Sequence, residues 1–319
     1  MEQNLLEVKN LRVHYVTDTE DVQAVNGVDL HLKKGEVLGL VGETGAGKTT
    51  VALSVMQLVP DPPGIILDGE ILFKGKNLIY NSDRENQEMR GNGISMIFQD
   101  PMTALNPIMT IGKQLAEVVI KHKKLSKKAA MEVAAEMLER VGVTRDRIND
   151  YPHQFSGGMK QRAIIAMALL CNPEILIADE PTTALDVTIQ AQVLEIIRSL
   201  IRENEMSMIL ITHDLGVVAE TCDQVAIMYA GEVVEYGSIW DVYTNPKHPY
   251  TRGLFDSIPK MDVDDERLSP IPGLTPNSTA LPSGCYFHPR CKYCHERCRE
   301  QSPAMKGDTH QYKCWLDIE

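Results

Sequence analysis

The chain has 319 residues, a formal net charge of -12 at pH 7 and 43% hydrophobic residues. This length supports one large core plus an appendage, and the acidic balance argues against a nucleic-acid surface, which needs clustered Lys and Arg. No uncharged apolar run approaches the roughly 18 residues that span a bilayer, and Met1 to Asn10 lack a signal-peptide pattern. We therefore expect a cytosolic protein. The basic run from Lys121 to Lys128 is read as a solvated helix end, with contact to lipid headgroups as the less favoured alternative.

Residues 5 to about 93 alternate in the manner of strands, and Asp68-Gly69 is typical of a hairpin turn. The apolar run Val37 to Val41 predicts a buried strand, and the segment Gly42 to Thr49 after it fits the pattern G-x-x-x-x-G-K-[ST]. Its glycines allow an amide-lined nest around phosphate oxygens, to which a helix beginning near Lys48 adds its positive end. We expect Lys48 to reach the β- and γ-phosphates and Thr49 to bind Mg²⁺. The alternative is a glycine-rich turn that binds nothing.

From about residue 101 to 154 the apolar pattern becomes helical. Met131, Ala134, Ala135 and Leu138 have helical spacing, and Gly142 is placed as a C-terminal stop. Directly afterwards, Ser156-Gly157-Gly158 precede an apolar helical stretch. A serine N-cap followed by two glycines leaves backbone amides open, which predicts a second anion site; an ordinary capped helix is the alternative.

The run Ile175 to Glu180 is apolar for four residues and ends in two acids. It predicts a buried parallel strand whose carboxylates emerge at its C-terminal edge, where open α/β sheets bind ligands. Asp179 can then hold Mg²⁺ and Glu180 can polarise a water. The alternative is an acidic helix start. The βα alternation continues from residue 155 to about 236 and completes the core sheet.

In this order, the three motifs resemble those of the ATP-binding cassette (ABC) ATPases, whose signature motif usually has glutamine at the position of Met159. The resemblance implies an α/β fold: a P-loop ATPase core with an antiparallel β subdomain, a helical subdomain at about 100–155 and a small cysteine-containing C-terminal extension. It also implies that the signature of one subunit closes on the γ-phosphate held by the other. One site for ATP and Mg²⁺ would thus be divided between two molecules.

Four further positions resemble family residues, and each has a local alternative. Gln99 resembles the glutamine that contacts Mg²⁺ and the attacking water, and His213 the histidine on the γ-phosphate, although a strand-end histidine is often structural. Asp186 resembles a loop aspartate that communicates across the dimer, or it caps a helix. Tyr15 resembles the aromatic that stacks on adenine, or it is a core tyrosine. The implied catalytic residues are Glu180, His213 and Lys48, and the implied nucleotide- and Mg²⁺-binding residues are Tyr15, Gly42, Glu43, Thr44, Gly45, Ala46, Gly47, Lys48, Thr49, Thr50, Gln99, Ser156, Gly157, Gly158, Asp179 and Asp186.

Beyond Thr244 the composition changes, because nine of the seventeen prolines lie there. We place a boundary between an ATPase domain, 1–243, and an extension, 244–319. Five of the seven cysteines lie in the last 35 residues, and Cys291 and Cys294 are the only close pair. In a reducing compartment such a group indicates a metal or cluster site before disulfides. A zinc site and unligated thiols remain alternatives.

The extension resembles that of one group within the ABC ATPases. Its segments His248 to Thr251, Ile271 to Gly273 and Gly284 to Cys291 look like the C-terminal region of the oligopeptide/dipeptide and nickel importer ATPases, so the resemblance covers essentially the whole chain. Some members of that family carry a [4Fe-4S] cluster here. The positions that match its ligands are Cys285, Cys291, Cys298 and Cys314. Cys294 falls where the family more often has a small residue, so it is either a spare thiol or a substitute ligand.

The resemblance implies the ATPase subunit of a bacterial-type peptide importer, at the cytoplasmic face of the membrane and in indirect contact with it. Its expected partners are two permease subunits, a homologous second ATPase and, through the complex, an extracytoplasmic substrate-binding protein, but no nucleic acid. A nickel importer is the main alternative. A soluble ABC ATPase of DNA repair or translation and a non-catalytic regulatory cassette are less favoured, because no basic face or coiled-coil arm is visible and Glu180 is present.

Overall fold

The computed structural model describes residues 4–99, 104–182, 186–257 and 271–316. The chain divides into two compact units. Unit 1 comprises Met1–Leu32, Val37–Ile79 and Thr212–Glu319, and unit 2 comprises Lys33–Glu36 and Tyr80–Ile211. Within the described ranges, no helix combines the length and the apolar character needed to cross a membrane.

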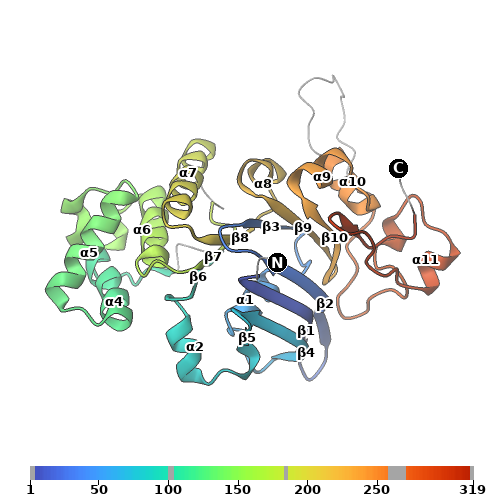
Figure 1. Ribbon diagram of the computed structural model, residues 1–319, viewed down its shortest axis with the longest axis horizontal. Helices are drawn as coiled ribbons and strands as arrows, with labels where there is room; N and C mark the ends of the chain where they lie inside the picture. Colours follow the sequence, from blue (N-terminus) through green and yellow to red (C-terminus); the bar gives the residue numbers. More distant parts are fainter. Residues whose placement is uncertain (1–3, 100–103, 183–185, 258–270, 317–319) are drawn as a thin grey trace. The chain divides into compact units, whose positions relative to one another are not determined.

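Unit 1 contains an antiparallel sheet with the strand order β2-β1-β4-β5 (Figure 1). In β1 the buried side chains are Leu6 and Val8, then Leu11 and Val13, so the alternation shifts by one residue. Asn10, with φ 46°, lies at this β-bulge, and the pairing of β1 with both neighbours shifts register there. The strands are β1 (Leu6–Val16), β2 (Asp21–Leu32), β4 (Gly64–Phe73) and β5 (Lys76–Asn77).

The hairpin turn predicted at Asp68-Gly69 is wrong, since both residues lie inside β4. Gly69 has φ 107° and sits opposite the bulge of β1, where a Cβ would come within 2.6 Å of the Lys9 carbonyl oxygen. Glycine is therefore required by a close strand approach rather than by a turn. The two-residue turn is instead Lys74-Gly75, between β4 and β5, and both its residues have positive φ.

The other strands of unit 1 follow the order β11-β10-β9-β3. Strands β3 (Val37–Val41) and β9 (Gln224–Tyr229) are parallel, whereas β10 (Glu232–Ser238) pairs antiparallel with β9 and with β11 (Gln311–Tyr312). Residues from the far C-terminal part thus extend the sheet that contains β3. The helices of unit 1 are α1 (Lys48–Val55), α8 (Leu215–Thr221), α9 (Ile239–Thr244), α10 (Pro249–Asp256) and α11 (Glu296–Glu300), with a 3₁₀ turn at His288–Arg290.

Unit 2 contains three parallel strands in the order β6-β7-β8. Their bounds are β6 (Ile94–Ile97), β7 (Ile175–Asp179) and β8 (Ser207–Ile211), and every residue of all three is buried. Parallel strands covered on both faces need continuous apolar runs, which explains why the sequence signal was a run and not an alternation. The predicted buried strand ending at Asp179 is confirmed.

The helices of unit 2 include the predicted helical segment, whose beginning at residues 101–103 lies outside the described residues. Helices α4 and α5 pack against each other and α6 contacts both (Figure 1). As predicted, α5 buries Ala134, Ala135 and Leu138, and Gly142, with φ 78°, lies just beyond its end. The helices are α2 (Asp83–Met89), α4 (Ile111–Lys123), α5 (Lys127–Arg140), α6 (Gly157–Leu169) and α7 (Val187–Glu203), with 3₁₀ turns at Arg145–Asn149 and Pro152–Gln154. A further 3₁₀ turn, Leu78–Tyr80, has its first two residues in unit 1 and its last in unit 2.

Candidate nucleotide-binding site

The glycine-rich segment Gly42–Thr49 leaves β3 and enters α1, as the sequence predicted. Gly47 occupies the N-cap position with φ 99°, and a Cβ on Gly42 would lie 2.2 Å from the Met228 carbonyl oxygen. Lys48, only 8% exposed, donates hydrogen bonds to the carbonyl oxygens of Gly42 (2.7 Å) and Glu43 (3.0 Å). Its ammonium group is thus held by the loop that would surround the phosphates.

Glu43 is held by two side chains from beyond Thr244. Its backbone N–H donates to the Tyr250 hydroxyl at 2.9 Å. Its carboxylate accepts two hydrogen bonds from Arg290, at 2.7 and 3.0 Å. These hydrogen bonds raise the pKa of Arg290, and burial raises the pKa of Tyr250, so Arg290 is charged and Tyr250 is neutral at physiological pH. Apart from the presence of both residues in family-like segments, nothing in the sequence pattern indicates this contact.

Tyr15 lies near the start of α1, because its hydroxyl is 3.4 Å from the Thr50 hydroxyl. The tyrosine is half-buried rather than part of the core. His213 is exposed, two residues beyond the end of β8. Asp214 beside it caps α8 by accepting from the backbone N–H groups of Gly216 and Val217. In unit 1 the structure thus places Tyr15 beside the helix that follows the glycine-rich segment.

The two acids after the apolar run of β7 occupy different environments. Asp179 is 1% exposed at the strand end, whereas Glu180 is half-buried. Glu180 has φ 47°, a left-handed backbone conformation that costs a non-glycine residue about 1 kcal/mol. Its N–H donates to the Ile211 carbonyl (2.8 Å), and its carboxylate accepts from the Gln99 amide (3.0 Å). The structure therefore brings Gln99 and Glu180 together, a pair that lies 81 positions apart in the sequence.

The Ser156-Gly157-Gly158 turn begins α6. The Ser156 hydroxyl accepts from the Met159 N–H at 3.3 Å, which is the predicted N-cap. Ser156 and Gly157 are exposed, and a Cβ on Gly157 would meet nothing within 4 Å. Asp186 is likewise an N-cap, of α7, accepting from Ile189 N–H at 3.0 Å. Local capping and a function in nucleotide binding are compatible for both residues, because each is exposed.

Gln161, one turn into α6, has no predicted role. It is 1% exposed, and its side-chain amide donates to the carbonyl oxygen of Pro181. Pro181 directly follows Glu180, so α6 is tied to the end of β7. A buried glutamine in an apolar helix is the only signal that could have identified this link.

The cysteine group lies in unit 1, and none of the seven cysteines forms a disulfide. The Cys285 N–H donates to the Cys298 carbonyl oxygen at 2.8 Å. Burial raises the pKa of Cys285 to about 12 and that of Cys291 to about 11, and the neighbouring thiols Cys298 and Cys314 add to both shifts. Among the described residues, no three His, Cys, Asp or Glu side chains are placed as ligands of a single metal ion.

Backbone N–H groups point at three of the sulfur atoms. Cys285 receives one from Phe287 and Cys291 one from Tyr293, and the Leu316 N–H lies 3.4 Å from the Cys314 sulfur. Such hydrogen bonds favour thiolates. Cys294 is also a neighbour of Cys291. Neighbouring thiols that repel one another as thiolates, with amides placed to stabilise three of them, fit the chemistry of an iron-sulfur cluster, whose thiolates surround a core of several ions.

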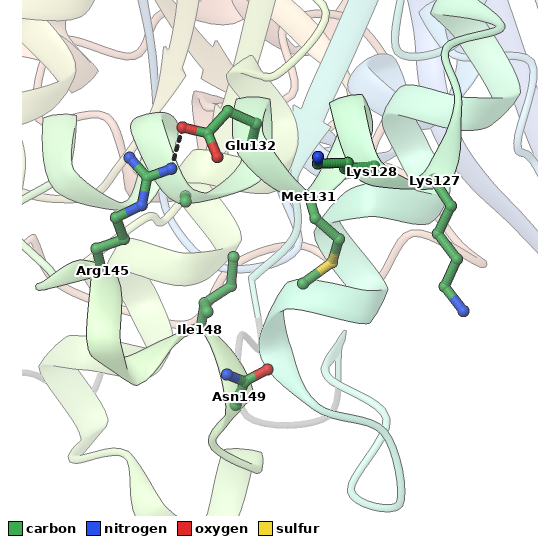
Figure 2. Close-up of a pocket in the computed structure, with 8 residues that line it drawn as sticks. Lys127, Lys128, Met131, Glu132, Arg145, Ile148 and Asn149 are labelled. Carbon is green, nitrogen blue, oxygen red and sulfur yellow. Dashed lines mark hydrogen bonds and ion pairs between the residues drawn. The ribbon is translucent and has the colours of Figure 1, made fainter.

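A separate hollow of about 570 Å³ lies among the helices of unit 2, and none of the predicted site residues line it. Figure 2 shows Glu132 and Arg145 paired at one side of it and Lys127 and Lys128 at the other, with the side chains of Met131 and Ile148 lower in the view. It is lined by Lys127, Lys128, Met131, Glu132, Ala135, Arg145, Ile148 and Asn149.

Comparisons with known proteins agree with both parts of the chain. The ABC transporter family model matches residues 25–183, and the model of the oligopeptide/dipeptide transporter C-terminal region matches residues 234–298. The oligopeptide transport ATP-binding protein OppD of Bacillus subtilis is 52% identical over 317 residues, which cover 98% of this chain and 88% of the relative. The dipeptide transport ATP-binding protein DppD of the same organism is 50% identical over 318 residues, with 98% and 95% covered.

Solved structures show the same fold. A dimeric post-hydrolysis state of the ATP-binding cassette MJ0796, bound to ADP and Pi, has a TM-score of 0.66 and 27% identity, covering 73% of this chain and 98% of that one. The structure of cbiO1 from Clostridium perfringens, part of the ABC transporter complex cbiONQ, has a TM-score of 0.64 and 27% identity, with 76% and 92% covered. The predicted α/β cassette fold is confirmed.

Proposed function

Because the chain belongs to the family of ATP-binding subunits of oligopeptide/dipeptide ABC transporters, we propose that it hydrolyses ATP to power the import of di- or oligopeptides. The observation that carries this proposal is identity near one half, over nearly the full length, to relatives named for peptide transport. The C-terminal region supports it further, since a separate family model named for oligopeptide/dipeptide transporters matches there.

In this proposal the chemistry is phosphoryl transfer to water. Lys48 and Thr49 act on the phosphates and Mg²⁺, and Asp179 on Mg²⁺. The hydrogen bond between Gln99 and Glu180 supports their shared action on the attacking water, because it holds the Glu180 carboxylate in one orientation. His213 contacts the γ-phosphate. Thr44, Gly45 and Ala46 supply backbone amides to the nest, and Tyr15 and Thr50 lie on the adenine side.

Two chains, this one and a homologous partner, would sandwich two nucleotides. The exposure of Ser156 and Gly157 supports a site completed by a second molecule, as does the dimeric, ADP-bound state of the related cassette MJ0796. Closure of the two cassettes would drive two permease subunits between inward- and outward-facing states, at the cytoplasmic face of the membrane. Substrate choice would then lie in the permease and its extracytoplasmic binding protein.

We propose that the extension of residues 244–319 holds a [4Fe-4S] cluster on Cys285, Cys291, Cys298 and Cys314, with a zinc ion as the alternative. When bound, the cluster would supply folding energy to a proline-rich segment. Anaerobically purified protein should be brown, with iron and sulfide near four each per chain. Serine at any one of the four cysteines should remove the colour, whereas Cys294→Ser should keep it. Colourless protein with one tightly bound zinc would establish the alternative.

The transported substrate can be tested directly. The chain is purified from native membranes together with its permeases and second ATPase, and the complex is placed in lipid vesicles with its binding protein. Peptide-loaded binding protein should stimulate ATP hydrolysis, and Ni²⁺-loaded protein should not. Stimulation by Ni²⁺ alone would reverse the proposal in favour of a nickel importer, and copurification with no permease would favour a soluble ABC ATPase.

A further inference from the structure

An acidic residue lies inside the phosphate-binding loop. Glu43 is the second residue of Gly42–Thr49, and its carboxylate is 27% exposed. A nucleotide triphosphate brings several negative charges to this loop, so an uncompensated carboxylate there opposes its binding. Because the group is partly shielded from water, solvent and salt reduce this repulsion only in part. The loop therefore needs a cation that neutralises Glu43 without competing for the phosphates.

Arg290 is that cation. Its side chain is only 6% exposed and makes both guanidinium–carboxylate hydrogen bonds to Glu43. The rest of the guanidinium is also held: it donates to the carbonyl oxygens of Ile271 and Pro272 and lies 3.4 Å from the Tyr229 hydroxyl. An arginine fixed at so many points cannot swing toward a bound phosphate, so its charge serves Glu43.

The position of Arg290 in the chain is also informative. It ends the 3₁₀ turn His288–Arg290, which begins just after Cys285, and is followed directly by Cys291. Tyr250 also holds Glu43, because its hydroxyl accepts a hydrogen bond from the Glu43 backbone N–H. The cysteine-containing extension thus holds both the side chain and the backbone of one loop residue, whose carbonyl oxygen in turn accepts a hydrogen bond from Lys48.

We propose that Arg290 is a positioning residue of the nucleotide site, through which the C-terminal extension neutralises Glu43 and sets the phosphate-binding loop. This inference rests on the proposed phosphate contact of the loop, and not on what the cysteines bind. If the extension sets the loop in this way, damage to the segment from Cys285 to Cys291 should also weaken ATP binding.

The test measures ATP affinity of the purified full chain with a fluorescent nucleotide. Arg290→Gln should weaken ATP binding roughly tenfold, because it leaves the Glu43 carboxylate unpaired beside the phosphates. The loss should be smaller for ADP and should shrink at high salt. Adding Glu43→Gln to Arg290→Gln should restore most of the affinity, because the repelling charge is then gone. A purely structural role for Arg290 predicts no such rescue.

Lys292→Gln is the matched control. It removes one positive charge two positions away, from an exposed side chain that lies over the Tyr293 ring and makes no contact with Glu43. It should leave ATP affinity unchanged. Affinity equal to wild type in Arg290→Gln, or a double variant as weak as Arg290→Gln alone, overturns the inference. Lys48→Ala separates the two proposals. If Lys48→Ala binds ATP as tightly as wild type, the proposed function of the loop is wrong. If Lys48→Ala loses affinity and Arg290→Gln does not, only the inference about Arg290 is wrong.

Discussion

Two glycine-rich segments precede helices in this protein, and their surroundings differ. Gly42 and Glu43, at the start of the first segment, are enclosed by their own chain, with Tyr250 and Arg290 on Glu43 and the Met228 carbonyl oxygen where a Gly42 Cβ would stand. The Ser156–Gly158 turn has a local cap, and the space beside Gly157 is open within 4 Å. Similar sequence signals can therefore mark a loop that its own chain contacts, which we call the closed segment, and a loop beside which space is free, the open segment. Free space of this kind is what the proposed contact with a second molecule would need.

The largest expected effect comes from variants that separate ATP binding from ATP-dependent dimerisation. Lys48→Ala should reduce ATP affinity of the isolated chain at least about 100-fold, because it removes the charge that the loop directs at the phosphates. Ser156→Arg should leave that affinity nearly intact yet abolish ATP-dependent dimerisation. Nucleotide titration and light scattering measure the two properties. Equal loss of both in Ser156→Arg would show that the turn serves local folding only.

The chemical step should be separable from both segments. Glu180→Gln keeps size and the contact with Gln99 but cannot accept a proton, so turnover should fall at least ~10²-fold while ATP binding survives. The variant should accumulate as an ATP-bound dimer. ATPase assays on the assembled transporter provide the measurement, and a variant with half of the wild-type rate would rule out Glu180 as the general base.

Alanine at one glycine of each segment sharpens the contrast in stability. Gly42→Ala places a methyl group 2.2 Å from a backbone carbonyl oxygen that cannot rotate away, so the free energy of unfolding should fall by about 3 kcal/mol. Gly157→Ala enters open space at a helix start and should change it by less than about 0.5 kcal/mol. Urea unfolding of both variants decides the matter, and equal effects would remove the distinction between a closed and an open segment.

The smallest expected effect is a pH dependence of stability, and it concerns only the surroundings of the closed segment. His248 is 1% exposed, and its Nδ1 accepts the N–H of Tyr250 at 3.1 Å, which requires a neutral ring. Burial lowers its pKa to about 4, with the nearby Lys313 adding to the shift and Glu235 opposing it. Because the unfolded chain binds the proton more readily, with a pKa near 6.5, stability is full above about pH 6.5 and falls as the pH approaches 4.

His248→Asn supplies the comparison, since asparagine can cap α10 but does not titrate. Between pH 7 and pH 5 the wild-type chain should lose about 2 kcal/mol more unfolding free energy than this variant. Identical pH profiles by urea unfolding would mean that His248 is not the group that titrates. ATP affinity should weaken over the same range in the wild type, because α10 carries the tyrosine that holds the Glu43 amide.

The features that the sequence predicted correctly depend on residues close in sequence, and those that it missed depend on residues far apart. Parallel strand β7, helix α5 and the caps at Ser156 and Asp186 were predictable because each depends on side chains close in sequence. Asp68-Gly69 was misread because the same dipeptide suits a turn and a close strand approach, and only the bulge of β1 opposite it decides between them.

The motifs and the family-like extension were enough to identify the family of the chain. The phosphate nest, the acidic strand end and the capped turn each depend on residue types at fixed spacings, which can be read directly from the sequence. Tertiary structure alone decided which side chains support them. Gln99 meets Glu180, Gln161 reaches the residue after Glu180, and Arg290 pairs with Glu43 across 247 positions. No local pattern encodes such pairs, since ion pairs and side-chain hydrogen bonds depend on distances that only the folded chain sets.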